Sequence, residues 1–431
     1  MKIAVKHVGP IETLVVIESE RPTPHYELSL NKNMLMIGRS GSGKSTLVLI
    51  LHFLPFILLN NIARSGYITN ILDKYFHIYC REGSQIDIIL PLSDILSTEH
   101  IESITGLAYD HALKKYPYVR VRLRYIGKTV ECSSENSWSI DIYLETNKGK
   151  LVKKDLPFDT WRDIVINVFR KVSNIITVPY LYLAKVKEYT LTILTNIEKM
   201  LTRNEDKYNF LNELRLLILT RLPFMKPIVI RSFENLREIL ESIYVDHSLT
   251  LLKDITDRYS HIEIDKDYFK ILIKGDGLID IDACSTGELV SMLLESALNI
   301  CESAILKELS ISDNHYIVID DIFYGLTYRD LYHIINSVLT KIDQNYSIKV
   351  MFLTHRIELF YSQEAQSILN KVYVMSRGFS KLEHYIYSKY GEILGKLVRN
   401  VVIDLEIDNI SEIVKDEIWE ESSKILEKSR T

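Results

Sequence analysis

Short apolar runs, typical of strands, dominate the first part of the chain. Residues 2–18 carry two such runs on either side of Gly9-Pro10, which predicts a strand–turn–strand. Residues 33–37 form another apolar run, and an apolar helix is predicted from the next segment to about Phe53. Further strands are predicted at 84–91, 118–126, 138–146 and 150–153.

The pattern changes near Phe158. From there to about Tyr259 the spacing of apolar residues is mostly helical, with prolines between the segments. Strands are predicted again at 261–264, 268–273, 315–320, 348–354 and 371–375. Helices are predicted at 287–307 and 328–341, and from the last of these strands to the chain end. Two α/β blocks that flank a helical stretch indicate one discontinuous α/β domain, a mixed sheet flanked by helices, with an inserted helical subdomain.

The segment between the strand at 33–37 and its helix has phosphate-binding chemistry. Residues 38–45 match G-x-x-x-x-G-K-[ST] in full, which predicts binding of ATP and Mg²⁺. Backbone amides and the helix N-terminus attract phosphate. Lys44 is expected to reach the β- and γ-phosphates, Ser45 the Mg²⁺ ion, and Thr46 the α-phosphate. The expected nucleotide-binding residues are Gly38, Arg39, Ser40, Gly41, Ser42, Gly43, Lys44, Ser45 and Thr46. The alternative is a chance glycine-rich turn.

An apolar strand that ends in two acids lies far along the chain, at residues 316–321. Asp320 is expected to hold the Mg²⁺ ion, and Asp321 to orient or deprotonate the attacking water. The alternative is a strand that only meets an acidic turn.

Residues 285–288, Ser-Thr-Gly-Glu, open a long apolar helix. Ser285 and Glu288 fit a capping box, which is a purely structural interpretation. A capped helix start that contains Gly287 can also bind an anion. The P-loop already binds the phosphates of the nucleotide in its own protomer. We therefore expect these residues to contact the γ-phosphate of ATP on a second copy.

His355 follows the strand predicted at 348–354. This strand comes next after the one that ends in the acidic pair, and a polar residue at its end is expected near the γ-phosphate. There His355 would sense the phosphate and hydrogen-bond the attacking water. The alternative is a structural histidine.

These four motifs, in this order, resemble the ABC-type ATPase superfamily, in its SMC/RecF/OLD-like branch. The opening Val8-Gly9-Pro10-Ile11 and the stretch from Ile319 to Leu326 are similar to that branch. The resemblance implies ATP hydrolysis by a homodimer whose two heads sandwich two ATP molecules. We expect four parts: a P-loop lobe at 1–155, a helical insertion or lid at 156–260, a second lobe at 261–390 and an acidic helical tail at 391–431.

The chain also departs from that branch. Asp321 stands where the family has glutamate, which predicts slow hydrolysis, and Thr327 stands where it has a D-loop aspartate or histidine. Gln85 is the only candidate before the signature for the family's Q-loop glutamine. The sequence has no long heptad run and no zinc-hook cysteines, and too few residues follow His355 for a fused nuclease domain.

Composition narrows the class of protein. Hydrophobic residues make up 47% of the 431 residues and charged residues 25%, as in soluble globular proteins. The four cysteines form no C-x-x-C pair, so neither a zinc site nor a disulfide framework is indicated. The longest apolar run, Leu47 to Leu59, is too short to span a bilayer, and no signal peptide is indicated, so we expect a cytoplasmic protein. Scarce glutamine favours a thermophilic source.

The net charge of −5 is concentrated in the tail, where residues 404–428 are strongly acidic, so a basic patch can exist elsewhere. Strict alternation at 119–125 predicts a strand with Arg120, Arg122 and Arg124 on one face. Lysines near this strand in sequence are Lys114, Lys115, Lys148, Lys150, Lys153 and Lys154. Such a strip could bind DNA phosphates, and the alternative is a solvated strand face.

Three functions stay open at this level. The first is an ATPase that acts on DNA, in repair, chromosome maintenance or anti-phage defence. The second is a nucleotide-gated scaffold or sensor that holds a partner such as a separate nuclease or toxin. A transporter ATP-binding subunit is disfavoured, because about 240 residues separate Lys44 from Ser285.

Overall fold

The computed structural model describes residues 1–18, 21–38, 42–63, 72, 76–127, 138–153 and 155–178, and the strands at 259–264, 269–273, 277–280, 315–320, 348–354, 371–376 and 400–404. Most of these strands belong to one large mixed sheet. A separate small antiparallel sheet consists of β11 (Tyr259–Ile264), β12 (Phe269–Ile273) and β13 (Gly277–Asp280).

One half of the large sheet is parallel, with the strand order β10, β14, β15, β5, β16. The bounds are β10 Ile175–Val178, β14 His315–Asp320, β15 Ile348–Thr354, β5 Met34–Ile37 and β16 Lys371–Ser376. All six residues of β14 are buried, and the strand is nearly continuous in apolar residues, as parallel strands covered on both faces require.

The other half of the sheet is largely antiparallel. β17 (Asn400–Asp404) links the halves, because it pairs antiparallel with β16 and parallel with β2. The order continues β2, β1, β6, β7, β8, β9. The bounds are β2 Ile11–Glu18, β1 Lys2–Val8, β6 Cys80–Pro91, β7 Tyr118–Tyr125, β8 Trp138–Glu145 and β9 Leu151–Lys153, with β3 Arg21–His25 beside β2 and β4 Leu28–Ser29 beside β1.

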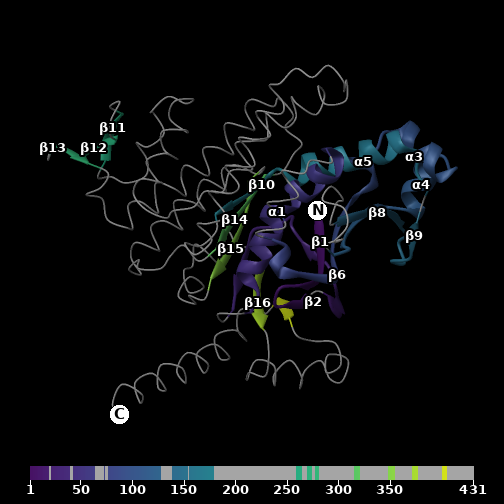
Figure 1. The fold of residues 1–431 in the computed structure, drawn as a ribbon, viewed down its shortest axis with the longest axis horizontal. Helices are drawn as coiled ribbons and strands as arrows, with labels where there is room; N and C mark the ends of the chain where they lie inside the picture. The colour runs from purple at the N-terminus through teal and green to yellow at the C-terminus, as the bar shows by residue number, and fades with distance from the viewer. Residues whose placement is uncertain are drawn as a thin grey trace, which may run out of the picture.

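The central helix α1 (Lys44–Ala63) lies between these two halves (Figure 1). It contacts β10, β14 and β15 on one side and β8 and α5 (Phe158–Val172) on the other. By length and composition α1 could cross a membrane, but 83% of its most apolar window is buried inside the protein, as in a core helix. The helix runs through Pro55, although the sequence predicts an end near Phe53. Burial on every side outweighs the hydrogen bond that proline removes.

Short elements complete the described part of the chain. They are η1 His77–Tyr79, η2 Leu92–Asp94, α3 Thr98–Thr105 and α4 Tyr109–Lys115. Together with β8 and β9, α3 and α4 form the end of the molecule at the right of Figure 1.

Most of the strands expected from the sequence are confirmed to within a few residues, but five strands are new, among them the short β3 and β4. β10 lies in the stretch expected to be helical, β13 was not expected, and β17 lies in the tail expected to be helical. The runs IITV and NVVID are short and rich in β-branched residues, and the sheet around them decides their conformation. The division into lobes, insertion and tail stays a prediction.

Candidate functional site

The P-loop strand and the acid-bearing strand end at the same edge of the parallel sheet. The register aligns Leu353 of β15 with Met36 of β5 on one side and Asp320 of β14 on the other. The Gly38 amide donates to the Thr354 carbonyl at 3.2 Å, so the P-loop begins where β15 ends. Ligands of open α/β sheets bind outside the carboxyl ends of the strands, so this edge is the candidate nucleotide site.

Two glycines of the P-loop are required by their surroundings. A Cβ on Gly38 would lie 2.3 Å from the carbonyl oxygen of Met375 in β16, which leaves no room for a side chain. Gly43 has a φ of 105°, in the region that favours glycine. Its carbonyl accepts from the Leu47 amide at 2.9 Å, in the first turn of α1. These are positions at which the phosphate-binding motif has glycine.

Lys44 is the first residue of α1, and its side chain reaches back to Gly38. Its ammonium donates to the Gly38 carbonyl, and the residue is only 7% exposed. Ser42 and Thr46 are also buried. A buried ammonium needs polar or anionic partners, and phosphate oxygens are well suited to that role beside a helix N-terminus.

Asp320 and Ser45 are the residues suited to a metal ion. Asp320 is the last residue of β14 and is fully buried, and Ser45 is the second residue of α1. A hydroxyl and a carboxylate are oxygen ligands of the kind that Mg²⁺ takes, with phosphate oxygens and water completing its shell. In the part of the chain that the structure describes, no three metal-ligating His, Cys, Asp or Glu side chains gather. Ser45 and Asp320 would supply two oxygen ligands to a Mg²⁺ ion bound together with nucleotide phosphates.

The remaining predicted site residues lie outside the described residues, so their roles stay predictions: Arg39, Ser40, Gly41, Ser285, Gly287, Glu288, Asp321 and His355.

The turn between β1 and β2 packs against the P-loop helix, which the sequence did not predict. Gly9 has a φ of +54°, and a Cβ there would lie 3.1 Å from Cγ2 of Thr46 and 3.4 Å from the Tyr79 ring. The Gly9 amide also donates to the Tyr79 carbonyl. Gly9-Pro10 indicates a turn in the sequence, but not the element against which that turn packs.

A buried pair joins α1 to the strand beside β14. Nδ1 of His52 lies 2.9 Å from Oγ1 of Thr177 in β10. Burial lowers the pKa of His52 to about 4, so the imidazole is neutral at physiological pH. In the sequence His52 is only an interruption of an apolar run.

The structure describes Gln85, the candidate Q-loop residue. It lies on β6 between β1 and β7, in the antiparallel half of the sheet, and its side chain donates to Asp87 at 3.0 Å. A Q-loop role for Gln85 stays a prediction.

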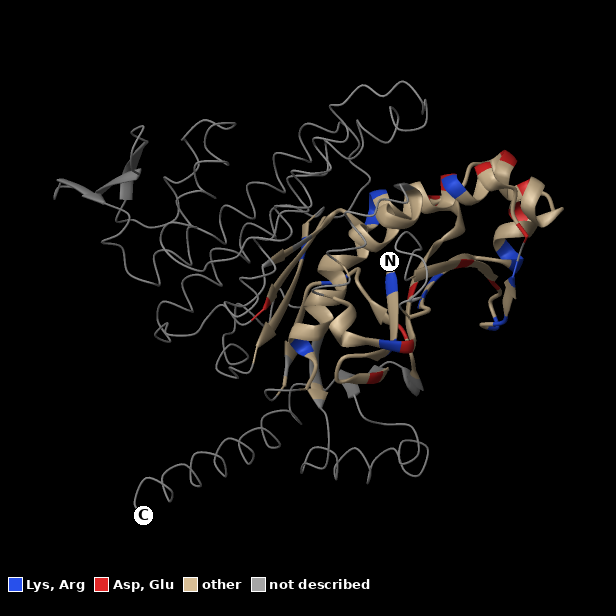
Figure 2. Cartoon of the chain, in the orientation of Figure 1, with Lys and Arg blue, Asp and Glu red and all other residues tan. Residues whose placement is uncertain are grey.

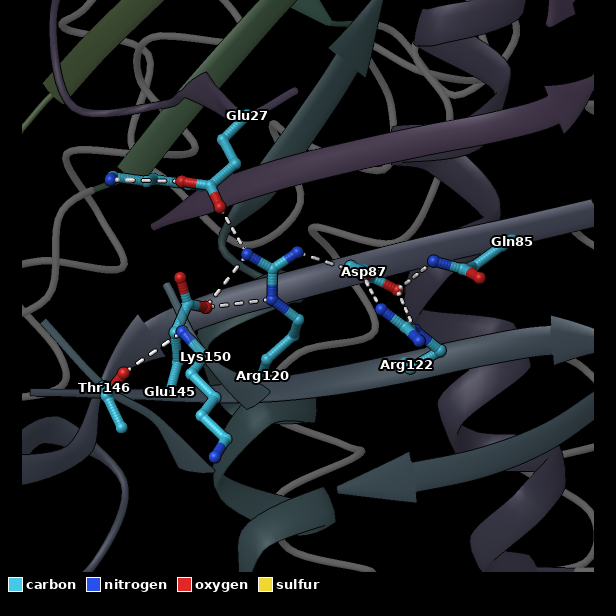
Figure 3. A network of polar contacts seen from close by, with 9 residues as sticks. Glu27, Gln85, Asp87, Arg120, Arg122, Glu145, Thr146 and Lys150 are labelled. Atoms are coloured by element: carbon cyan, nitrogen blue, oxygen red, sulfur yellow. Dashed lines mark hydrogen bonds and ion pairs between the residues drawn. The ribbon is translucent and has the colours of Figure 1, made fainter. Parts of the chain in front are cut away.

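The candidate DNA-contacting arginines do lie on one face of β7, since Val119, Val121 and Leu123 between them are fully buried. Two of the three are held by carboxylates (Figure 3). Arg120 donates to Glu145 at 2.9 Å, to Asp87 at 3.1 Å and to Glu27.

Arg122 makes a two-pronged contact with Asp87, at 3.0 Å from each oxygen, and lies over the Tyr143 ring. Burial alone disfavours the charged Arg120, but its bonds to Glu145 and Asp87 outweigh burial and raise its pKa. The bond to Asp87 is the main cause that raises the pKa of Arg122. Arg124 is exposed. The strip is therefore not the row of three solvated cations that the sequence suggests.

Comparisons with known proteins give structural similarities only. No protein-family model and no curated protein matches the sequence. A solved SMC head bound to the C-winged helix domain of ScpA has a TM-score of 0.42 and 11% identity, over 96% of this chain and 99% of that one. An Smc head with an extended coiled coil, bound to the C-terminal domain of ScpA derived from Pyrococcus furiosus, has a TM-score of 0.40 and 12% identity, over 96% and 98%.

The SMC head domain from Thermotoga maritima has a TM-score of 0.33 and 10% identity, over 94% of this chain and 98% of that one. At these identities and TM-scores the matches carry no conclusion about this chain.

Proposed function

We propose that this chain is an ATPase with an ABC/SMC-like P-loop head that acts on DNA. One observation carries the proposal: the P-loop and Asp320 meet at the carboxyl ends of parallel strands that have only β15 between them. A glycine-rich turn, a lysine at a helix start and a buried carboxylate are the parts that nucleotide phosphate and Mg²⁺ require.

Each part has a role in this proposal. The backbone amides of residues 38–46 and the ammonium of Lys44 bind the phosphates, and Ser45 and Asp320 hold Mg²⁺. The bound ion supplies positive charge to the phosphoryl oxygens. Asp321, which follows Asp320 in sequence, orients or deprotonates the water, and His355 senses the γ-phosphate. Because aspartate is one methylene shorter than glutamate, we expect slow hydrolysis.

The proposal includes a second copy of the chain. Ser285, Gly287 and Glu288 would contact ATP held by the partner protomer, so that ATP closes a head-to-head homodimer and hydrolysis reopens it. DNA is the proposed partner of that cycle, in genome maintenance or anti-phage defence.

Phosphate release in the presence of Mg²⁺ tests the enzymatic part. We expect Asp320→Asn to release phosphate on the order of 100-fold more slowly than the wild type, because a metal ligand contributes several kcal/mol to stabilising the transition state. Asp94→Asn, an exposed acid on η2, is the control and should match the wild type. Equal rates in Asp320→Asn and the wild type would contradict the assignment.

The partner requires a separate measurement. Binding of duplex DNA by the wild type at low salt supports DNA as the partner. An active ATPase without such binding would favour a nucleotide-gated scaffold for another protein.

A further inference from the structure

Four exposed lysines gather at one end of the antiparallel half, and we call them the lysine cluster: Lys114, Lys115, Lys148 and Lys150. Lys114 and Lys115 end α4, and the other two lie in the turn between β8 and β9. The Asn147 side chain donates to the Lys114 carbonyl and so joins the two segments. Figure 2 shows the basic residues of α4 and of the β8–β9 region at the right-hand end of the molecule.

The turn that carries half of the cluster has a fixed backbone. The Thr146 amide donates to the Lys150 carbonyl at 3.0 Å, and the Lys150 amide donates to Oγ1 of Thr146 at 3.1 Å. The preceding residue, Glu145, is held by Arg120 (Figure 3). The arginine–carboxylate network therefore anchors the base of the turn, and the lysines project from a rigid support.

The charges of the cluster are not neutralised within the described part of the chain. None of its four ammonium groups forms an ion pair there, whereas Lys2, Arg120, Arg122 and Lys153 on the same half of the sheet all do. Lysines at the end of α4 can be there to stabilise the helix, because its C-terminus carries the negative end of the dipole. This reason does not apply to the two lysines in the turn.

The cluster suits a phosphate backbone better than unpaired bases. Lysine is a flexible point charge that contacts phosphate without reading sequence. Binding of single strands relies on exposed rings on which bases stack. Tyr116, the ring beneath Lys115, is 7% exposed and so offers no such platform.

We propose that the lysine cluster is the surface on which this protein contacts the phosphate backbone of duplex DNA. Arg120 and Arg122 support that surface and do not touch the DNA. This inference rests on the proposed function, because it takes DNA as the partner.

The test uses the full chain with Mg²⁺ and ATP, a labelled duplex of mixed sequence, and fluorescence anisotropy over a range of KCl concentrations. The test variant changes all four cluster lysines to glutamine. The charge-matched control changes four exposed cations elsewhere to glutamine: Lys6, Arg81, Arg124 and Arg170. Thermal unfolding of each variant checks that it is folded.

We expect the cluster variant to bind roughly 100-fold or more weakly near ~0.1 M KCl. The slope of log K against log salt should become shallower by about three to four, since each phosphate contact contributes about 0.9. The control variant should keep at least half of the wild-type slope.

Three results would overturn the inference. If the wild type binds duplex DNA and the cluster variant binds equally well, the surface is wrong while the proposed partner stands. If both variants lose affinity equally, the effect is one of overall charge. If the wild type binds no duplex DNA, the proposed partner is wrong as well.

Discussion

Single residues in the P-loop decide whether the backbone can take its shape. Gly38 faces the Met375 carbonyl and Gly43 has a positive φ, so the two glycines are needed for different reasons. The motif predicts both glycines from the sequence. The sequence does not show that the group next to Gly38 belongs to β16, more than 300 residues away, because that contact exists only in the folded sheet.

We expect Gly38→Ala to destabilise the fold by about 1–3 kcal/mol and to weaken ATP binding, because its Cβ would meet backbone that cannot give way. Urea unfolding and titration with a fluorescent ATP analogue measure the two effects. Gly83→Ala is the matched control: Gly83 has a φ of +86° and open space around it, so only backbone strain should result. Unchanged ATP affinity in Gly38→Ala would contradict the geometry of the loop.

His52 predicts a pH dependence of stability. Its pKa is about 4 in the folded protein against an ordinary value of 6.5, so between these values the unfolded chain binds more protons. The free energy of unfolding should therefore fall as the pH drops from 6.5 to 4, by roughly 3 kcal/mol from this residue.

His52→Gln should remove this part of the slope, whereas His111→Gln, an exposed histidine on α4, should keep it. Urea unfolding at several pH values provides the comparison. A slope in His52→Gln as steep as in the wild type would show that the histidine is not buried neutral.

At the scale of elements, the sequence predicts β7 well and its environment poorly. The alternation of Val119, Val121 and Leu123 with arginines is confirmed, because side chains alternate across any strand. The carboxylates that bind those arginines come from β6, from β8 and from the segment before β4. Such long-range pairing leaves no local pattern, and the same holds for β10 and β17, whose partners decide that they are strands.

The network predicts unequal costs for two arginines on one strand. Arg120→Met should destabilise the protein by roughly 3–5 kcal/mol, because it leaves buried Glu145 without its partner cation and leaves Asp87 with Arg122 alone. Arg124→Met, on the exposed part of the same face, should stay within about 0.5 kcal/mol. Urea unfolding of both variants measures the difference, and equal costs would mean that the ion pairs do not form as described.

For the whole molecule, the proposed head needs a second copy to complete its site. Ser285→Arg should leave ATP binding intact but prevent ATP-dependent dimerisation, because the larger cation would meet the partner's nucleotide. Analytical ultracentrifugation with and without ATP measures dimerisation. Lys44→Ala is the comparison variant, because it should already be impaired in ATP binding. A Ser285→Arg protein that dimerises and hydrolyses ATP like the wild type would rule out the sandwich.

The central claim is that residues 38–46 bind nucleotide phosphate, and calorimetric titration of Mg²⁺ and ATP into the wild type and Lys44→Ala tests it most directly. Loss of the lysine should weaken ATP binding by roughly 10- to 100-fold, since hydrogen bonds to charged groups contribute about 1.5–3 kcal/mol. Lys6→Ala, an exposed lysine on β1, should bind like the wild type. Equal affinity of Lys44→Ala and wild type, or no binding by the wild type, would contradict the account.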